Sequence, residues 1–421
     1  MSIYLERYAY PPLYILPVAK PTTGLIIVIP VFNEQHTITA LNSLFKSDLP
    51  PVNTEALIII NQPEHCDKTV KHQNNHTLNE VKNWISLNQK PYLQFFVTHI
   101  TLPKKHAGVG LARKAGMDEA VRRFEEINNV KGIILCFDAD CTCSSSYLKN
   151  VYSSFKNKKL TGASINFEHT YHTLSTDKEE GIIQYELHLR YYVNGLRKAG
   201  YPYAFHTIGS SMAVRADVYV KAGGMNRRKA GEDFHFLHKI IPYGNYDEIT
   251  TATVFPSART SDRVPFGTGK AMGDWLHKKE TDMITYHPQI FKELEALFKI
   301  VPSFYATPDP QVLLKPLSTG IKAYLAQENY AHVLSNIQRQ STNLPTFIHR
   351  WFNWFNGLRT LHLVHYLRNN YYPSIAVSKA AAQLLEVKEG DTEKLLGMYR
   401  TLDKNFKADQ ISLKHLYSEF L

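Results

Sequence analysis

Two aspartates separated by one residue, Asp138 and Asp140, follow the apolar run 133–137. Such a run is typical of a buried strand, and carboxylates just beyond a strand can both face one divalent cation. Mg²⁺ and Mn²⁺ prefer carboxylate oxygens and usually keep bonds to substrate phosphates. An acidic turn that binds nothing is the alternative. The residues alone leave both interpretations open.

A second acidic pair, Glu232 and Asp233, follows Gly231 and opens a short amphipathic pattern over 232–241. A carboxylate at a helix N-terminus is stabilised by the helix dipole, and that structural role needs no catalysis. The functional alternative is a general base, which we expect to be ionised at neutral pH because the helix N-terminus lowers its pKa.

Arginines form a third group of candidates. Arg113 follows Gly108 and Gly110 near the start of a helical pattern over 111–127, and glycines before a helix allow phosphate to approach. A basic, solvated helix face is the alternative interpretation.

Arg259 and Arg263 lie in the stretch 250–270, which we expect to be irregular because it is rich in Arg, Ser, Gly and Pro. Long irregular loops are often functional. Two guanidinium groups there are suited to a pyrophosphate or an anionic acceptor. Pairing of these arginines with Asp262 in a solvent-exposed loop is the alternative.

Elements that would position these residues alternate along the first half of the chain. Short β-branched runs predict strands at 24–32, 56–60, 93–100 and 132–137, and helical patterns cover 38–45, 77–87 and 111–127. This alternation predicts βαβ units and a mainly parallel sheet flanked by helices. The carboxyl ends of such strands share one edge, where ligands bind.

The pattern changes after about residue 150. Helices are expected at 145–156, 177–197 and 232–241, a strand at 210–214, and mostly helices from 288 onward. We therefore predict an α/β catalytic domain over 1–288, with halves at about 22–142 and 143–288, and a helical C-terminal region over 289–421.

Overall composition narrows the class of protein. The net charge is +10 with a pI near 9.1, which favours anionic partners. No zinc finger, RNP-type strand or basic recognition helix points to nucleic acid. Four cysteines do not make a disulfide scaffold. No apolar run reaches the roughly 20 residues of a spanning helix, and no signal peptide is evident, so a cytoplasmic location is expected.

An aromatic stripe at helical spacing runs through 346–372, with arginines among its residues. Three interpretations are open: a helix buried against the catalytic domain, an interfacial helix in peripheral contact with an anionic membrane, and a dimer contact.

The order of these motifs resembles family 2 glycosyltransferases of the GT-A fold. The resemblance covers about 22–275, and its motifs are IPVFNE after the first strand, ARKAGMDEA after the third, FDAD after the fourth, and GED before a short helix. It implies a nucleotide-sugar donor (a UDP- or GDP-sugar), Mn²⁺ or Mg²⁺, and inversion at the anomeric carbon.

Residue roles follow from the same resemblance. Asp138 would lie near the donor ribose, and both Asp138 and Asp140 would bind the metal. Asp233 would deprotonate the acceptor hydroxyl, and Glu232 would contact the acceptor. The full donor site is expected to comprise Pro30, Phe32, Glu34, Asn61, Arg113, Asp138, Ala139, Asp140, Arg259 and Arg263.

Some positions depart from the family pattern. Asn61 and Gln62 stand where many members have an acidic pair that helps to hold the nucleobase. Ser257 and Arg259 stand where a histidine sometimes completes the metal site. The Gln-x-x-Arg-Trp motif and membrane helices of processive synthases are missing.

The predicted function is therefore transfer of a sugar to a hydroxyl of a glycan, lipid-linked or small-molecule acceptor, as in the synthesis of cell-envelope glycans or secondary metabolites. The alternatives are a nucleotidyltransferase of similar fold and a basic polyanion-binding protein without catalysis.

Overall fold

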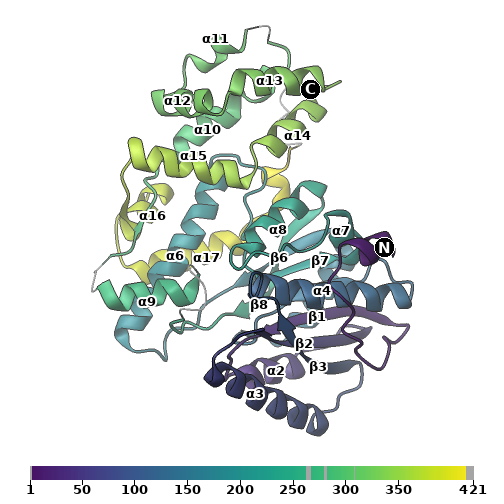
Figure 1. Cartoon of the computed structure of the whole chain (residues 1–421). Coiled ribbons are helices and arrows are strands. Elements are labelled where there is room, and N and C mark those ends of the chain that lie inside the picture. The colour runs from purple at the N-terminus through teal and green to yellow at the C-terminus, as the bar shows by residue number, and fades with distance from the viewer. Residues whose placement is uncertain (1, 262–266, 279–281, 308, 414–421) are drawn as a thin grey trace. The chain divides into compact units, whose positions relative to one another are not determined.

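The computed structural model describes residues 2–261, 267–278, 282–307 and 309–413, and the chain divides into two units (Figure 1). The first unit comprises Met1–Thr173 and Thr207–Ala271, and the second comprises Leu174–His206 and Met272–Leu421. The domain boundaries expected near residues 142 and 288 stay predictions.

An eight-stranded sheet forms the centre of the first unit, in the order β3-β2-β1-β4-β7-β6-β8-β5. Strands β3, β2, β1 and β4 are parallel, as are β6 and β8, whereas β7 and β5 run antiparallel to their neighbours. The predicted mixed, mainly parallel sheet is confirmed. The strands are β1 (Thr23–Val31), β2 (Asn53–Pro63), β3 (Leu93–Leu102), β4 (Ile133–Cys136), β5 (Thr142–Cys143), β6 (Gly162–Phe167), β7 (Met212–Arg215) and β8 (Tyr246–Phe255).

Both faces of β1 and β2 are buried, which explains their continuous β-branched runs. One face packs with residues of α2, α3 and α5 in the main apolar core. On the other face, α4 lies so close that a Cβ on Gly116 would collide with Val28 and lie 3.1 Å from Ile59. The helices of this unit are α1 (Ser2–Arg7), α2 (Thr37–Lys46), α3 (Lys68–Leu87), α4 (Val109–Glu126), α5 (Tyr147–Lys158), α7 (Ala216–Lys221) and α8 (Glu232–Ile240), with a 3₁₀ turn at Ile241–Tyr243.

Some elements differ from the sequence prediction, and α1, β5, β6 and α7 were not predicted at all. Residues 246–255 form β8, so the first part of the stretch expected to be irregular is a strand; its threonines conceal the apolar alternation. Helix α3 begins at Lys68 and not near 77, because its first turns are polar and largely exposed and carry no apolar period.

The second unit is mainly helical, as expected for the C-terminal region. A two-stranded sheet joins β9 (Ile284–Thr285) to β10 (Ile375–Ala376). Its helices are α6 (Thr176–Lys198), most of α9 (Thr268–Lys278), α10 (Gln289–Ile300), α11 (Pro310–Leu314), α12 (Thr319–Gln327), α13 (Tyr330–Arg339), α14 (Leu344–Trp354), α15 (Gly357–Asn370), α16 (Val377–Leu385) and α17 (Thr392–Asn405), with 3₁₀ turns at Pro302–Phe304 and Ala408–Ile411.

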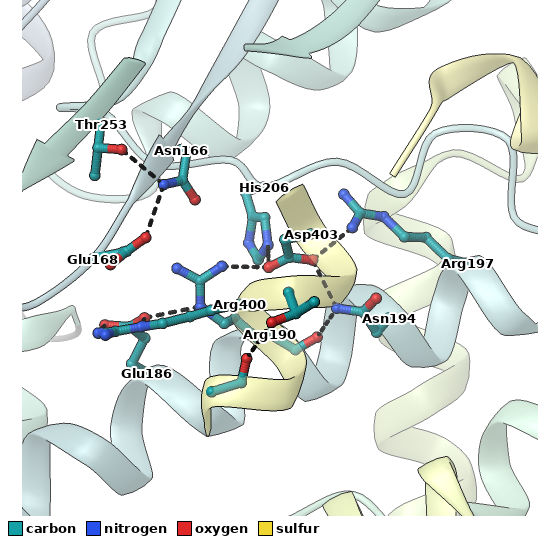
Figure 2. A network of polar contacts seen from close by, with 12 residues as sticks. Asn166, Glu168, Glu186, Arg190, Asn194, Arg197, His206, Thr253, Arg400 and Asp403 are labelled. Carbon is teal, nitrogen blue, oxygen red and sulfur yellow. Dashed lines mark hydrogen bonds and ion pairs between the residues drawn. The ribbon is translucent and has the colours of Figure 1, made fainter. Parts of the chain in front are cut away.

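A buried ionic cluster fastens α17 to α6 (Figure 2). Asp403 accepts from four side chains of α6 and the segment that follows it: Arg190, Asn194, Arg197 and His206. Burial alone would raise the pKa of Asp403, but His206 and the two arginines lower it well below its usual range. Glu186 binds Arg190 and Arg400 in the same cluster. The sequence motifs did not predict this cluster.

The aromatic stretch 346–372 is divided between α14 and α15, with Asn356 capping the second helix. Phe347, Trp351 and Phe355 are fully buried inside the second unit. These side chains therefore pack within the second unit, and the predicted burial against the catalytic domain stays a prediction. Among the described residues, no helix is both long and apolar enough to cross a membrane.

Replacing Gly116 by alanine should lower the free energy of unfolding by about 1–3 kcal/mol, the usual cost of overpacking, because the new Cβ would collide with Val28. Gly397→Ala is the matched control: it also lies within a helix, and its Cβ would meet nothing within 4 Å. There, helix propensity should add about 0.5–1 kcal/mol. Urea unfolding followed by circular dichroism checks both signs, and a stabilised Gly116→Ala protein would contradict the packing described.

Candidate active site

The turn after β4 carries the first acidic pair to the carboxyl edge of the sheet. The N–H of Phe137 donates to the carbonyl of Val28 on β1 at 3.1 Å, so the chain leaves the ladder just before Asp138. Ala139 is buried, whereas the carboxylates of Asp138 and Asp140 are 34% and 29% exposed. Backbone alternation thus leaves both carboxylates accessible at this edge.

Arg113 on α4 joins the two acidic motifs. One terminal nitrogen lies 2.7 Å from Asp138 Oδ1, and the other pairs with Glu232 Oε1. The Arg113 side chain is only 1% exposed, so it is enclosed by these partners. Burial opposes its charge, but Asp138 and Glu232 outweigh burial and raise the pKa of Arg113. The phosphate contact expected for this arginine stays a prediction; in the structure it lies between two carboxylates.

Glycines allow the chain to approach this arginine closely. A Cβ on Gly209 would lie 2.8 Å from the Arg113 nitrogens. A Cβ on Gly110 would collide with the carbonyl of Arg228 and lie 3.0 Å from Glu232 Cβ. The glycines before α4, interpreted as an approach for phosphate, therefore make room for the segment that leads into α8.

The second acidic pair differs in burial and in hydrogen bonding. Glu232 is 3% exposed and faces Arg113, while Asp233 is half-buried. The oxygens of Asp233 accept from the N–H groups of Gly209 at 2.9 Å and Phe234 at 2.7 Å. Asp233 is therefore held by backbone donors.

Burial raises the pKa of both carboxyls, to about 7 for Glu232, although Arg113 acts in the opposite direction. The two carboxyls also repel each other's charge. The expectation that the helix N-terminus would lower the pKa of the base is wrong in direction, because burial outweighs the local dipole.

Arg259 makes the second cluster. It bonds both carboxylate oxygens of Glu34 and lies 3.0 Å from Asp140 Oδ2. Glu34 is 2% exposed and also accepts from the N–H of His36 at 2.9 Å. Burial lowers the pKa of Arg259, but the two carboxylates raise it further than burial lowers it. Arg263 lies outside the described residues.

Asn61 supports the strand ends. Its side-chain nitrogen donates to the carbonyl of Val31 at 2.8 Å, and its own carbonyl accepts from Asn74 at 3.0 Å. Asn74 also accepts from the N–H of Asn33 at 2.9 Å. The sequence analysis missed Asn74, which no motif marks and which lies in the polar half of α3.

Pro30 is buried in β1 and pairs with Ile59, two residues beyond Val28, where the pairing with β4 ends. A proline fits there because its missing N–H removes no ladder hydrogen bond. Phe32 is half-buried at the end of the strand.

The structure thus gathers the predicted acidic and basic residues into two linked ion-pair clusters at one sheet edge. Five carboxylates share two guanidinium groups: Glu34, Asp138, Asp140, Glu232 and Asp233, with Arg113 and Arg259. Within the described part of the chain, no group of three or more His, Cys, Asp and Glu residues is placed to hold a metal ion.

Comparisons with known proteins were made for sequence and for structure. Residues 26–221 match the model of the family described as glycosyl transferase family 2. The solved structure of an S. aureus TarS fragment in complex with UDP-GlcNAc aligns at 13% identity and a TM-score of 0.38, covering 94% of this chain and 92% of that one; its UDP complex gives the same values.

A second S. aureus TarS structure aligns at 11% identity and a TM-score of 0.36, covering 82% of this chain and 55% of that one. Similarity this weak carries no conclusion about this chain. No curated protein matches the sequence significantly.

The raised pKa of Glu232 predicts a pH dependence of stability. A carboxyl whose pKa rises from 4.5 unfolded to about 7 folded binds more protons when folded, so its contribution to stability falls as pH rises through that interval. Glu232→Gln removes this dependence. Its stability relative to wild type should therefore be greater at pH 8 than at pH 5, by up to about 3 kcal/mol. Urea unfolding at both pH values checks this; a relative stability that is constant or falls with pH would contradict it.

Proposed function

Because residues 26–221 match the model of glycosyl transferase family 2, we propose that this chain is a nucleotide-sugar glycosyltransferase that transfers its sugar to a hydroxyl group with inversion at the anomeric carbon. The observation that carries the proposal is the Arg113 bridge between Asp138 and Glu232. Through this bridge Asp138 of the predicted donor motif and Glu232 of the predicted acceptor motif contact the two terminal nitrogens of one guanidinium. This supports the proposal because a single displacement needs the diphosphate site and the base close to one sugar, with the leaving group and the base on different faces of it.

The donor is a UDP- or GDP-sugar in this proposal, and its diphosphate binds at the carboxyl edge of β1 and β4. Arg259 is the guanidinium suited to phosphate contact, because its side chain is 27% exposed. Arg113 is enclosed and acts as a positioning residue that holds Asp138. The sequence analysis expected donor contacts from all three arginines, Arg113, Arg259 and Arg263, and the contact expected from Arg263 stays a prediction.

The residues at this edge fit a divalent cation. Asp138 and Asp140 offer hard oxygen ligands, and their side chains are 34% and 29% exposed at the sheet edge. The surplus of carboxylates over guanidinium groups is negative charge that a cation would offset. Asp138 and Asp140 would hold Mn²⁺ or Mg²⁺, with donor phosphate completing the ligand set. The bound ion would stabilise charge on the departing diphosphate.

Asp233 is the proposed base. It is more exposed than Glu232 and its oxygens are oriented by backbone N–H groups, which leaves lone pairs for an acceptor hydroxyl. Glu232 is occupied by Arg113, so we assign it a positioning role in place of the acceptor contact expected from the motif. The raised pKa of Asp233 brings it nearer to the working pH, which favours proton transfer.

Asp233→Asn should lower sugar transfer by about 10²–10⁴-fold, the usual contribution of a general base, while donor affinity barely changes. The assay follows nucleoside diphosphate release from UDP- and GDP-sugars with a panel of glycan, lipid-linked and small-molecule alcohols. Lys46→Ala, an exposed change on α2, is the control and should keep full turnover.

Two results would contradict the assignment. Full turnover by Asp233→Asn would remove the base role. A product with retained anomeric configuration, read by NMR, would exclude a single displacement. Release of no nucleoside diphosphate from any donor by the wild-type protein would overturn the proposed function itself.

A further inference from the structure

Two basic segments border the start of α8. Lys104 and Lys105 precede α4, and the run 227–229 precedes α8; all five basic side chains are exposed. The segments are more than a hundred residues apart in sequence. They nevertheless lie side by side, because a Cβ on Gly108 would be 3.1 Å from the Cα of Lys229.

The two basic segments themselves carry no acidic residue. No acidic residue occurs within 103–117 or 218–231. The charge acts on neighbouring groups. Burial is the main cause that lowers the pKa of His235 and of Lys114. Arg228 lowers the pKa of His235 further, and Arg227 lowers that of Lys114. A surface with such a field attracts anions.

The same surface is fixed to the acceptor side of the candidate site. Asn226 donates to the carbonyl of Glu232 at 2.8 Å and accepts from the N–H of Arg228 at 3.1 Å. A Cβ on Gly110 would lie 3.0 Å from Glu232 Cβ, so the start of α4 packs closely against Glu232. The basic residues are thus tied to the first turn of α8, which carries Asp233.

We propose that these five residues, Lys104, Lys105, Arg227, Arg228 and Lys229, bind an anionic acceptor, one that bears phosphate or carboxylate groups close to its reacting hydroxyl. The inference rests on the proposed function, since it takes Asp233 to mark the acceptor side. The acceptor hydroxyl would reach Asp233 while neighbouring anionic groups contact the basic surface. Arg259 and the Asp138–Asp140 edge serve the donor, so the two anionic substrates have separate cationic partners.

Binding of fluorescent polyphosphate and of alginate to the full chain, measured by anisotropy, tests the proposal; the two probes distinguish phosphate from carboxylate. The triple variant Arg227→Ala, Arg228→Ala, Lys229→Ala should bind at least one probe about tenfold more weakly than wild type, with a smaller dependence on salt. The matched control, Lys46→Ala, Lys82→Ala, Lys131→Ala, removes three exposed charges elsewhere in the same unit and should bind within about threefold of wild type. Circular dichroism melting confirms that both variants fold.

Three results would overturn the inference. Equal losses of probe affinity in both triple variants would show that the net charge of the protein, and not this surface, binds the probes. Displacement of the probe by UDP with Mn²⁺ would place it in the donor site. The triple variant at 227–229 could bind both probes as wild type does and yet lose binding to vesicles that contain phosphatidylglycerol. That result would identify a membrane-binding surface. Donor turnover by the wild-type protein, measured separately, tests the proposed function and is independent of these outcomes.

Discussion

A guanidinium enclosed by protein is the constraint on which the candidate site depends. Arg113 cannot lose its charge, so its burial requires carboxylates at close range. Asp138 and Glu232 meet that requirement from two separate motifs. Removal of one partner from such a buried pair typically costs about 3–5 kcal/mol, because the other charge is left without compensation. The separation of the two motifs is therefore set by one side chain.

The position of that side chain depends in turn on α4. Gly116 brings the helix against Val28 on one side of the sheet. Further along α4, Asp118 accepts from Tyr4 and Tyr219 at 2.7 Å and pairs with Lys114, so the N-terminal segment is fastened to the same helix. The geometry of the site is consequently a property of helix packing as much as of the acidic motifs. The same close packing leaves no room for a side chain at Gly110 or Gly209.

Local patterns predicted the elements whose burial is uniform. The continuous β-branched runs of β1 and β2 required two covered faces, and the acidic pair after β4 followed from the parallel arrangement. Strand β8 was not predicted because its threonines interrupt the alternation of apolar residues. Spacing along the chain identified Arg113, Asp138 and Glu232 but not their pairing, since such contacts depend on tertiary packing. The polar links through Asn74 and Gly209 gave no local signal, and the direction of the Glu232 pKa shift required knowledge of its burial.

Calorimetric titration of UDP and GDP into the protein, with and without Mn²⁺, tests most directly whether a nucleotide-sugar donor binds at the Asp138–Asp140 edge. The account predicts that at least one diphosphate binds wild type in the presence of Mn²⁺. Folded Asp140→Asn protein should bind it about tenfold or more weakly, in line with loss of a charged contact. Binding of equal affinity to wild type and Asp140→Asn, unaffected by Mn²⁺, would contradict the donor site assigned to this edge.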